Sequence, residues 1–357
     1  MNQNISFTPP HLDPLISVII PCYNAAAFLP NCMKCLEEQT IGIEHLELIF
    51  VDDASSDQGA TWDAILAFEA KYPNQVVAIQ HEENTGAGGA RNTGLLYAKG
   101  IYVGFMDTDD GIDSSFYQIM YEKAAEYDCD VVECGYVREL PNATNDLHCP
   151  KEGFIRYDKS VVDGRPSWHF DIDTPLWNKL YRHALITEHT ICFPESLLLE
   201  DYFFNKCLNP FIKSIYFIEQ ALYHWKRHET ATSFSDSSKT QHLFDFIEIE
   251  DALLSHYQSL GLLERFYLQI QGEFLFSYGE SMSTLFLLDL LDYPHYLRLS
   301  NSVQRYFPDY ENHPALAQSE NAKEKTLLSI LNKNYTKEQF QVLAAELKEI
   351  LIQMYIH

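Results

Sequence analysis

Short runs of apolar residues alternate with helix-forming stretches through the first 140 residues, and this alternation constrains the fold more than any other feature of the chain. The runs are almost continuously apolar, which is typical of strands that are buried on both faces of a sheet. Helices between such strands favour a doubly wound α/β domain, in which a mostly parallel sheet is flanked by helices. The predicted strands are 15–20, 46–51, 76–79, 101–106 and 130–137, and the predicted helices are 25–38, 60–71, one from about Ala90, and 115–127.

The remaining sequence predicts a second half of this domain and a helical appendage. Loops with a short strand are expected at 141–173, helices at 174–189 and 197–209, and a strand at 214–225. After about residue 240 the periodicity is helical. The predicted organisation is a tail at 1–14, an α/β domain at 15–238 with halves 15–140 and 141–238, and a helical region at 239–357.

Acidic residues outnumber basic ones, 51 to 25, which gives a formal net charge of −26. This charge repels nucleic-acid phosphates, so no nucleic-acid partner is expected. The N-terminus lacks the basic start and apolar run of a signal peptide, and no stretch reaches the roughly 20 apolar residues of a membrane span. Eight dispersed cysteines, with Cys32 and Cys35 inside a predicted helix, indicate reduced and packed thiols. The chain is therefore predicted to be cytoplasmic.

Polar loops follow four of the predicted strands. The carboxyl ends of parallel strands share one edge of a sheet, where ligands bind, so these loops are expected to converge on one ligand. The loops are PCYN at 21–24, DDASSD at 52–57, NTGAGGARNTG at 84–94 and FMDTDDG at 105–111.

The fourth loop places three carboxylates, Asp107, Asp109 and Asp110, within four positions. Clustered like charge raises the pKa of at least one carboxyl unless a cation neutralises it, and carboxylate oxygens suit Mg²⁺ or Mn²⁺. This loop therefore predicts a divalent-metal site. The other loops have structural alternatives. DDASSD suits a turn and helix cap, and GAGG suits a turn. GAGG also does not match the dinucleotide-binding motif, because it follows the third strand.

Seven segments, in order, give the chain a resemblance to family 2 glycosyltransferases with the GT-A fold, in particular to bacterial polysaccharide-building members. The segments are SVIIPCYN, VDDASSD, NTGAGGARNTG, FMDTDDG, WNKLYR, FPESLLLEDYFF and YHWKRHETATS. The resemblance covers roughly residues 15–235. It implies that 15–140 is the nucleotide-sugar-binding half of the domain and that 141–238 is the acceptor-side half.

The resemblance implies that the first two loops bind a nucleobase. Pro21 and Tyr23 are expected to border a uracil-type ring, with Asn24 supporting their loop. Asp53 is expected to accept a hydrogen bond from the ring N–H, with Asp52 as the neighbouring candidate. A carboxylate acceptor suits an imide N–H, and an aromatic face suits stacking.

The third and fourth loops correspond to positions near the sugar and phosphates. Asn84 is expected near the nucleotide, and Arg91 either neutralises a phosphate or braces the acidic loop. Asp107 and Asp109 occupy the position of the family's DxD motif and are assigned to the metal and the donor ribose. Asp110 is assigned as an additional metal ligand.

Two downstream segments carry the expected acceptor side. Glu200 and Asp201 match the family's acidic pair at the start of a helix, and Asp201 is assigned as the general base of an inverting displacement. The alternative is that this pair only charges the first turn of its helix. Trp177 and Lys179 are expected on the acceptor side, although Lys179 also suits a surface cation on a core helix.

The last segment departs from the family pattern, because Trp225 and Lys226 stand where a tyrosine and an arginine are usual. One basic residue among Lys226, Arg227 and His228 is expected to meet the diphosphate. Ser233 is expected on the donor side.

These assignments predict a metal-dependent inverting glycosyltransferase that moves a sugar from a nucleotide-sugar donor, a UDP-sugar, to a hydroxyl of a glycan, lipid-linked or glycoprotein acceptor. A sugar-phosphate nucleotidyltransferase remains an alternative, although its glycine-rich segment is expected behind the first strand, where this chain has PCYN. A non-catalytic nucleotide-sugar-binding partner subunit also remains open, although the acids at 107, 109 and 201 count against it. The C-terminal helices leave open a homo-oligomer or peripheral contact with the inner face of the cell membrane.

Overall fold

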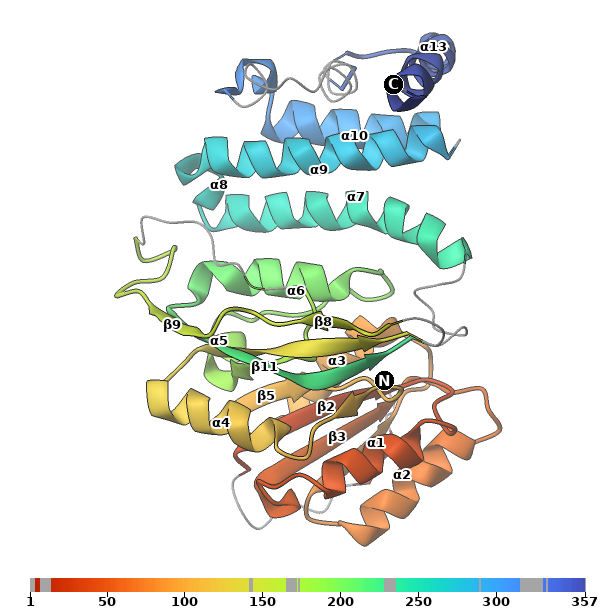
Figure 1. Ribbon diagram of the computed structural model, residues 1–357. Helices are drawn as coiled ribbons and strands as arrows, with labels where there is room; N and C mark the ends of the chain where they lie inside the picture. The colour runs from red at the N-terminus through yellow and green to blue at the C-terminus, as the bar shows by residue number, and fades with distance from the viewer. Residues whose placement is uncertain are drawn as a thin grey trace. The chain divides into compact units, whose positions relative to one another are not determined.

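The computed structural model describes residues 4–6, 14–140, 144–164, 172, 174–227, 236–288, 290–314, 330–331 and 333–356. The chain divides into two compact units, Met1–Ala231 and Thr232–His357. The N-terminal unit holds the sheet, and the described part of the C-terminal unit is helical (Figure 1).

The N-terminal unit is built on a mixed sheet with a parallel centre. Its strand order is β1-β4-β3-β2-β5-β10-β7-β11-β6, and β4, β3, β2 and β5 pair in parallel. The predicted α/β class, with a mostly parallel sheet flanked by helices, is confirmed. The strands are β1 (Asn4–Ser6), β2 (Ile16–Cys22), β3 (Leu46–Asp52), β4 (Val76–Gln80), β5 (Tyr102–Phe105), β6 (Gly111–Ile112), β7 (Val131–Glu139), β8 (Asp146–His148), β9 (Gly153–Arg156), β10 (Lys179–Arg182) and β11 (Ser214–Lys226).

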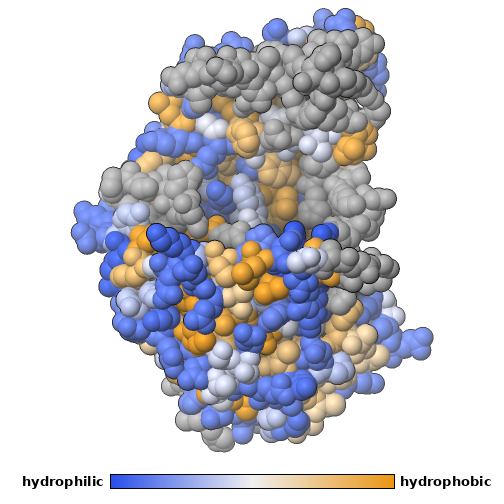
Figure 2. All heavy atoms as spheres, in the orientation of Figure 1, coloured by the Kyte–Doolittle hydropathy of each residue, from blue (hydrophilic) through white to orange (hydrophobic). Residues whose placement is uncertain are grey.

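Helices cover both faces of the parallel strands because residues on both faces are apolar. Val18 on β2 packs in the same buried cluster as Leu29 and Ile65 from two helices on one face. The neighbouring Ile19 points to the other face, where a Cβ added to Gly94 would come within 2.4 Å of it. The helices of this unit are α1 (Leu29–Glu37), α2 (Ala60–Lys71), α3 (Gly86–Tyr97), α4 (Phe116–Tyr127), α5 (His183–Glu188) and α6 (Glu200–Leu208). On the face seen in Figure 2, hydrophobic residues of this unit are interspersed with hydrophilic ones.

Three local predictions differ from the structure. The sequence predicts a helix over 174–189, but β10 occupies 179–182 and pairs antiparallel with both β5 and β7. The predicted tail includes β1, which extends the sheet by pairing with β4. The helix expected from about Ala90 begins at Gly86, so the glycine-rich segment forms its first turn.

The C-terminal unit packs its helices around apolar side chains such as Leu253, Tyr278 and Leu299. Within it, α9 contacts α7 and α13, and α7 also contacts α10. Across the described ranges, no helix combines the length and the apolar character needed to cross a bilayer. Within the helical region predicted at 239–357, residues 315–329 lie outside the described residues. The helices are α7 (Asp236–Ser259), α8 (Leu262–Arg265), α9 (Tyr267–Leu287), α10 (Tyr293–Tyr306) and α13 (Lys337–Ile356).

Candidate active site

The loops that follow β2 and β3 are bound to each other. Asn24 has a positive φ of 51°, its backbone N–H donates to Ser55 Oγ at 2.8 Å, and its Oδ1 accepts from the Ser56 N–H at 2.8 Å. Asn24 therefore links the two loops, and Pro21 lies just before it at the end of β2. The Tyr23 side chain is 53% exposed, which leaves its ring available for stacking.

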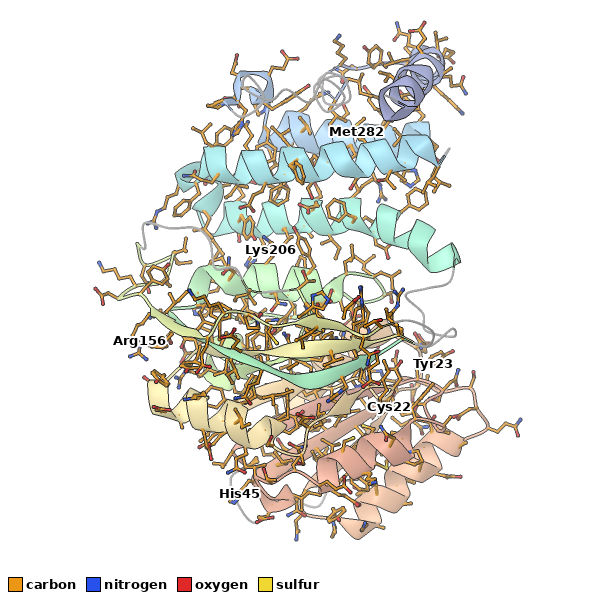
Figure 3. The ribbon with its side chains drawn as sticks, in the orientation of Figure 1. Cys22, Tyr23, His45, Arg156, Lys206 and Met282 are labelled. Carbon is orange, nitrogen blue, oxygen red and sulfur yellow. The ribbon has the colours of Figure 1, made fainter. Side chains whose placement is uncertain are left out.

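Figure 3 shows Tyr23 at one end of the parallel strands and His45 at the other. Tyr23 directly follows β2, whereas His45 directly precedes β3. The loops that follow the parallel strands therefore share the carboxyl edge of the sheet, as predicted for a ligand site.

The two acids after β3 have different surroundings. Asp52 is fully buried, and its oxygens accept from the Ser55 N–H at 3.1 Å and from Gln80 Nε2 at 2.9 Å. The hydrogen bonds that the described residues make to the Asp53 carboxylate fall on Oδ1, including those from the N–H and hydroxyl of Thr85 at 2.9 and 3.0 Å. The protein therefore holds Asp53 through Oδ1, whereas both oxygens of Asp52 accept hydrogen bonds from the protein.

His81 is a site residue that the sequence reasoning missed. Its ring nitrogens lie 2.7 Å from Asp53 Oδ1 and 2.9 Å from Thr93 Oγ1, so the ring ties Asp53 to α3. The available signal was its position two residues after the predicted strand 76–79, at the edge where the polar loops converge. Thr85, between them, also lies 3.2 Å from His81 Nδ1.

The first turn of α3 lies against a segment from the acceptor-side half. A Cβ added to Gly88 would come 2.3 Å from the backbone oxygen of Pro194, so only glycine fits this approach. Ser196 donates its backbone N–H to the oxygen of Thr85 at 3.0 Å. Asn84 donates to the backbone oxygen of Asp53 at 3.1 Å. This turn therefore connects the nucleotide-side loops to the segment that leads into α6.

Arg91 joins two acids that lie far apart in the sequence. Its guanidinium donates to Glu200 Oε1 at 2.5 Å and to Asp107 Oδ1 at 3.1 Å, and the residue is 5% exposed. Burial opposes the charged form, but Asp107 and Glu200 outweigh it and hold the pKa of Arg91 above its usual value. Of the two predicted roles for Arg91, the contacts show the bracing of the acidic loop.

Asp110 is held inside the protein. It is 1% exposed, its Oδ2 accepts from the Tyr223 hydroxyl at 2.7 Å, and its Oδ1 accepts from the Lys226 N–H at 2.8 Å. Burial, and then the charges of Asp107 and Asp109, raise the pKa of Asp110 well above its usual value. Because both oxygens are engaged, the predicted metal-ligand role does not fit the contacts of Asp110.

Asp107 and Asp109 remain as the residues that could hold a cation. The Asp107 side chain is 33% exposed. In the part of the chain that the structure describes, no group of three or more His, Cys, Asp or Glu side chains is arranged to hold a metal ion. Mg²⁺ and related ions are commonly bound by one or two carboxylates together with substrate phosphates and water, so a two-acid site fits this chemistry. The metal itself stays a prediction.

The basic segment at the end of β11 reaches the acidic loop through Lys226, the last residue of this strand. Its Nζ lies 3.3 Å from the point where a Cβ on Gly111 would stand. Arg227 donates its backbone N–H to Glu139 at 3.0 Å. His228 and Ser233 lie outside the described residues.

The two residues predicted on the acceptor side differ in accessibility. Trp177 stacks on Tyr223 with ring centroids 4.3 Å apart, next to Asp110. Lys179 is fully buried; its Nζ donates to Pro175 O at 2.5 Å and to Asn178 Oδ1 at 2.8 Å. Neither predicted role for Lys179 holds, because burial in β10 keeps the ammonium from both an acceptor and the surface.

Asp201 lies in the first turn of α6, next to the glutamate that pairs with Arg91. Burial, and then the charge of Glu200, raise the pKa of Asp201 to about 6. Its Oδ1 accepts from the Tyr202 N–H at 2.7 Å. A carboxylate with a pKa near 6 suits a general base that works near neutral pH.

The comparisons with known proteins agree with this arrangement. Residues 17–190 match the family model described as glycosyl transferase family 2. This region of the chain belongs to the family. The chain is 30% identical over 227 residues to EpsH of Bacillus subtilis, which is named as a glycosyltransferase, with 60% of this chain and 61% of EpsH covered. It is 32% identical over 203 residues to the poly(ribitol-phosphate) β-glucosyltransferase of Bacillus spizizenii, covering 56% of this chain and 30% of that protein. The alignments thus span about three fifths and less than a third of these relatives.

A solved structure shares the fold of the chain. The structure of S. aureus TarS residues 1–349 in complex with UDP-GlcNAc superimposes with a TM-score of 0.65 at 23% identity, and covers 91% of this chain and 92% of that chain. The domain therefore has the GT-A fold.

Proposed function

We propose that this chain transfers a sugar from a UDP-sugar to a hydroxyl of a cell-surface glycan, with inversion at the transferred carbon and with a divalent metal. The observation that carries the proposal is the Arg91 bridge between Asp107 and Glu200. The bridge brings the acids that would face the donor diphosphate beside Asp201, the acid suited to activate an acceptor. The UDP-GlcNAc complex of TarS and the glucosyltransferase name of the Bacillus spizizenii relative support the choice of reaction and donor.

The donor end is proposed at the loops after β2 and β3. Asp53 Oδ2 accepts the ring N–H of the base, while His81 and Thr85 fix Oδ1. Tyr23 supplies the stacking face, because its ring is half exposed at this edge.

The diphosphate is proposed to lie over the acidic loop. Asp107 and Asp109 would hold Mn²⁺ or Mg²⁺, which stabilises the charge that develops on the leaving diphosphate. Of Lys226 and Arg227, Lys226 is the better candidate to bind the same phosphates, because its ammonium lies beside Gly111. Asp110 keeps Lys226 in place through the backbone N–H.

The acceptor hydroxyl is proposed to lose its proton to Asp201. A hydroxyl is a weak nucleophile, so an ionised carboxylate within hydrogen-bond reach accelerates its attack. Glu200 does not fit this role, because its Oε1 is paired with Arg91 at 2.5 Å.

A donor screen tests the reaction class. Purified full chain is incubated with UDP-, GDP- and dTDP-sugars and Mn²⁺, and nucleotide release is measured with and without excess EDTA. We expect release from a UDP-sugar that EDTA abolishes. Release that is equal in EDTA would remove the metal from the mechanism, and a lack of release from every donor would remove the transferase proposal.

The variant Asp201→Asn tests the role of Asp201 as the general base. It also tests the alternative that the chain is a non-catalytic nucleotide-sugar-binding subunit. The amide cannot accept the proton, so kcat should fall by about 10²–10⁴-fold while UDP affinity is retained. Glu195→Gln, an exposed acid in the segment before α6, is the control and should leave kcat unchanged. Turnover by Asp201→Asn at the wild-type rate would place the base elsewhere.

A further inference from the structure

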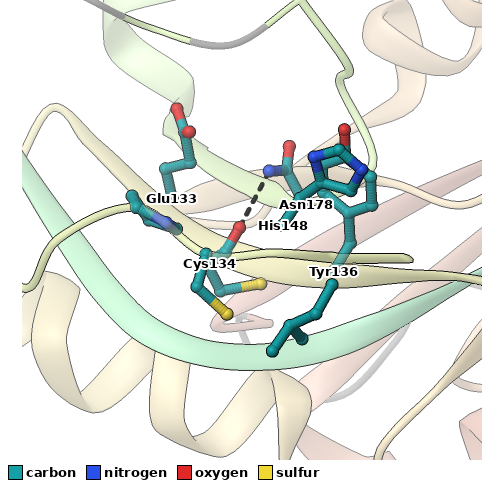
Figure 4. A pocket seen from close by; sticks show the side chains of 8 residues that line it. Glu133, Cys134, Tyr136, His148 and Asn178 are labelled. Carbon is teal, nitrogen blue, oxygen red and sulfur yellow. Dashed lines mark hydrogen bonds between the residues drawn. The ribbon is translucent and has the colours of Figure 1, made fainter. Parts of the chain in front are cut away.

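A pocket of about 390 Å³ lies beside β7 in the N-terminal unit, and none of the roles above uses it (Figure 4). Glu133, Cys134 and Tyr136 line it from β7. His148 and Cys149 line it from the end of β8, and Asn178 from the residue before β10. A volume of a few hundred Å³ lies within the range of small-ligand sites.

The pocket exists because two strands share one side of β7 and leave a gap. β10 pairs with β7 as far as Glu133, β8 pairs with it from Tyr136 onward, and β11 covers the opposite side. Asn178 donates to the backbone oxygen of Cys134 at 2.8 Å, which closes the floor of the gap. At Gly135 a Cβ would meet Cys149 Sγ at 2.5 Å, so glycine allows β8 to approach here.

The strand that leads into the acidic loop and the strand that lines this gap run in the same direction. Leu180 of β10 pairs with Gly104 of β5 and with Val132 of β7, and β5 and β7 run in the same direction because each is antiparallel to β10. Past these pairs, β5 runs on into the acidic loop and β7 runs on along the pocket. The paired parts of β5 and β7 are two strand spacings apart, or about 10 Å.

Aromatic contacts connect the pocket to the same loop. The Tyr136 ring meets Trp177 edge to face at 4.8 Å, and Trp177 stacks on Tyr223 at 4.3 Å. Tyr223 in turn donates to Asp110 at 2.7 Å. The Tyr136 ring in the pocket is therefore linked through Trp177 and Tyr223 to the acidic loop.

The lining combines an aromatic platform with hydrogen-bonding groups. The His148 ring stacks on Tyr136 at 4.7 Å with an interplanar angle of 13°, and no described residue hydrogen-bonds to its ring nitrogens. Leu147 beside it is 68% exposed. The negative charge of Glu133 is neutralised by Lys179, whose Nζ lies 3.5 Å from Glu133 Oε2. An apolar platform, free ring nitrogens and balanced charge match a sugar ring, which has a C–H face and several hydroxyls.

We propose that this pocket binds a neutral sugar unit of the acceptor glycan and so positions the acceptor beside the transfer site. The proposal rests on the proposed function. His148 is the positioning residue, through the face of its ring and its ring nitrogens. The experiments below distinguish sugar binding from two other outcomes: a pocket that serves packing alone, and a pocket that binds an anion.

Alkylation of Cys149 tests occupancy without turnover. Cys149 and Cys192 are both exposed, but only Cys149 lines the pocket, so Cys192 is an internal control. The full chain is treated with iodoacetamide in the presence of p-nitrophenyl β-glycosides of glucose, galactose and N-acetylglucosamine, and both thiols are followed by peptide mass spectrometry. A glycoside that binds should about halve the Cys149 rate at a concentration equal to its Kd and leave the Cys192 rate unchanged. Unchanged Cys149 rates with all three glycosides, or protection by inorganic phosphate alone, would overturn the proposal.

His148→Ala tests the platform. Loss of the stacking face should raise the glycoside concentration that gives half-protection by about tenfold, and His45→Ala, at the opposite edge of the sheet, should not. In transfer assays the same change should appear in KM for the acceptor with kcat nearly constant. Equal protection of wild type and His148→Ala would overturn the assignment. Because protection needs no donor, it can fail while nucleotide release succeeds, and the two proposals are therefore tested separately.

Discussion

The loops after β3 and β5 both begin with acids at the end of a parallel strand, yet the structure holds them in different ways. Asp52 and Asp53 are held by partners within about 30 positions, such as Gln80 and His81. The acidic loop is held by Arg91 and by groups more than 100 positions away. Asp110 binds Tyr223 and the Lys226 N–H at separations of 113 and 116.

The two loops lie at the same edge of the sheet, but they depend on different parts of the chain for their conformation. The hydrogen bonds to the Asp52 and Asp53 carboxylates come from the nucleotide-side half, so the position of Asp53 depends less on the rest of the chain. The acidic loop is complete only when the acceptor-side half has folded onto it. Arg91, which also binds Glu200 beside Asp201, makes the position of the donor acids depend on the position of the base.

Gly88→Ala should break the long-range support and leave the loop after β3 intact. The added Cβ would stand 2.3 Å from the backbone oxygen of Pro194, which cannot rotate away. We expect a loss of about 3 kcal/mol, the upper end of the usual cost of overpacking, or roughly 6–12 °C in Tm for a unit of this size. Thermal unfolding measures the effect. Gly153→Ala is the matched control, because nothing lies within 4 Å of its added Cβ. Equal Tm values for the two variants would show that the α3 contact with 193–196 is dispensable.

Asp53→Asn should act in the opposite way, on binding rather than on stability. The amide oxygen can keep the hydrogen bonds of Oδ1, but the NH₂ group replaces the acceptor offered to the base. Hydrogen bonds to charged groups contribute about 1.5–3 kcal/mol, so the Kd for UDP should rise about 10- to 100-fold with little change in Tm. Isothermal titration with UDP measures this, and Asp63→Asn, an exposed acid on α2, serves as control. An unchanged Kd would remove Asp53 from the base site.

Asp110→Asn and Asp109→Asn compare two acids of one loop. In Asp110→Asn an amide N–H faces the Tyr223 hydroxyl, which donates to Asp110 in the wild type. The hydroxyl can instead accept from this N–H, so we expect a moderate loss of about 1–2 kcal/mol in unfolding free energy. Asp109→Asn should leave Tm nearly unchanged and weaken metal-dependent UDP binding. Loss of metal dependence in Asp110→Asn without a fall in Tm would make Asp110 a ligand after all.

The same contrast explains which parts could be predicted from the sequence. The parallel strands and their polar loops could be predicted because strand periodicity and loop chemistry are local. The division of work among Asp107, Asp109 and Asp110 could not, since it depends on Tyr223 and the Lys226 N–H, which no local pattern associates with the acids. β10 was predicted as helix because its spacing is helical, but the slot between β5 and β7 decides its conformation.

The pH dependence of transfer gives the smallest expected effect and tests the link between Glu200 and Asp201. Burial and the Glu200 charge raise the pKa of Asp201 to about 6. Its ionised form accepts the proton, so kcat/KM should be constant above this pKa and fall as the pH decreases through it. At pH 5 about a tenth of Asp201 is ionised, and kcat/KM should be about tenfold below its plateau. Glu200→Gln removes the neighbouring charge and should move the fall to lower pH, whereas Glu195→Gln should not move it. A profile that is flat between pH 5 and 8 in the wild type would show that Asp201 does not control the rate, and the acidic pair would then serve only to hold Arg91 at the start of α6.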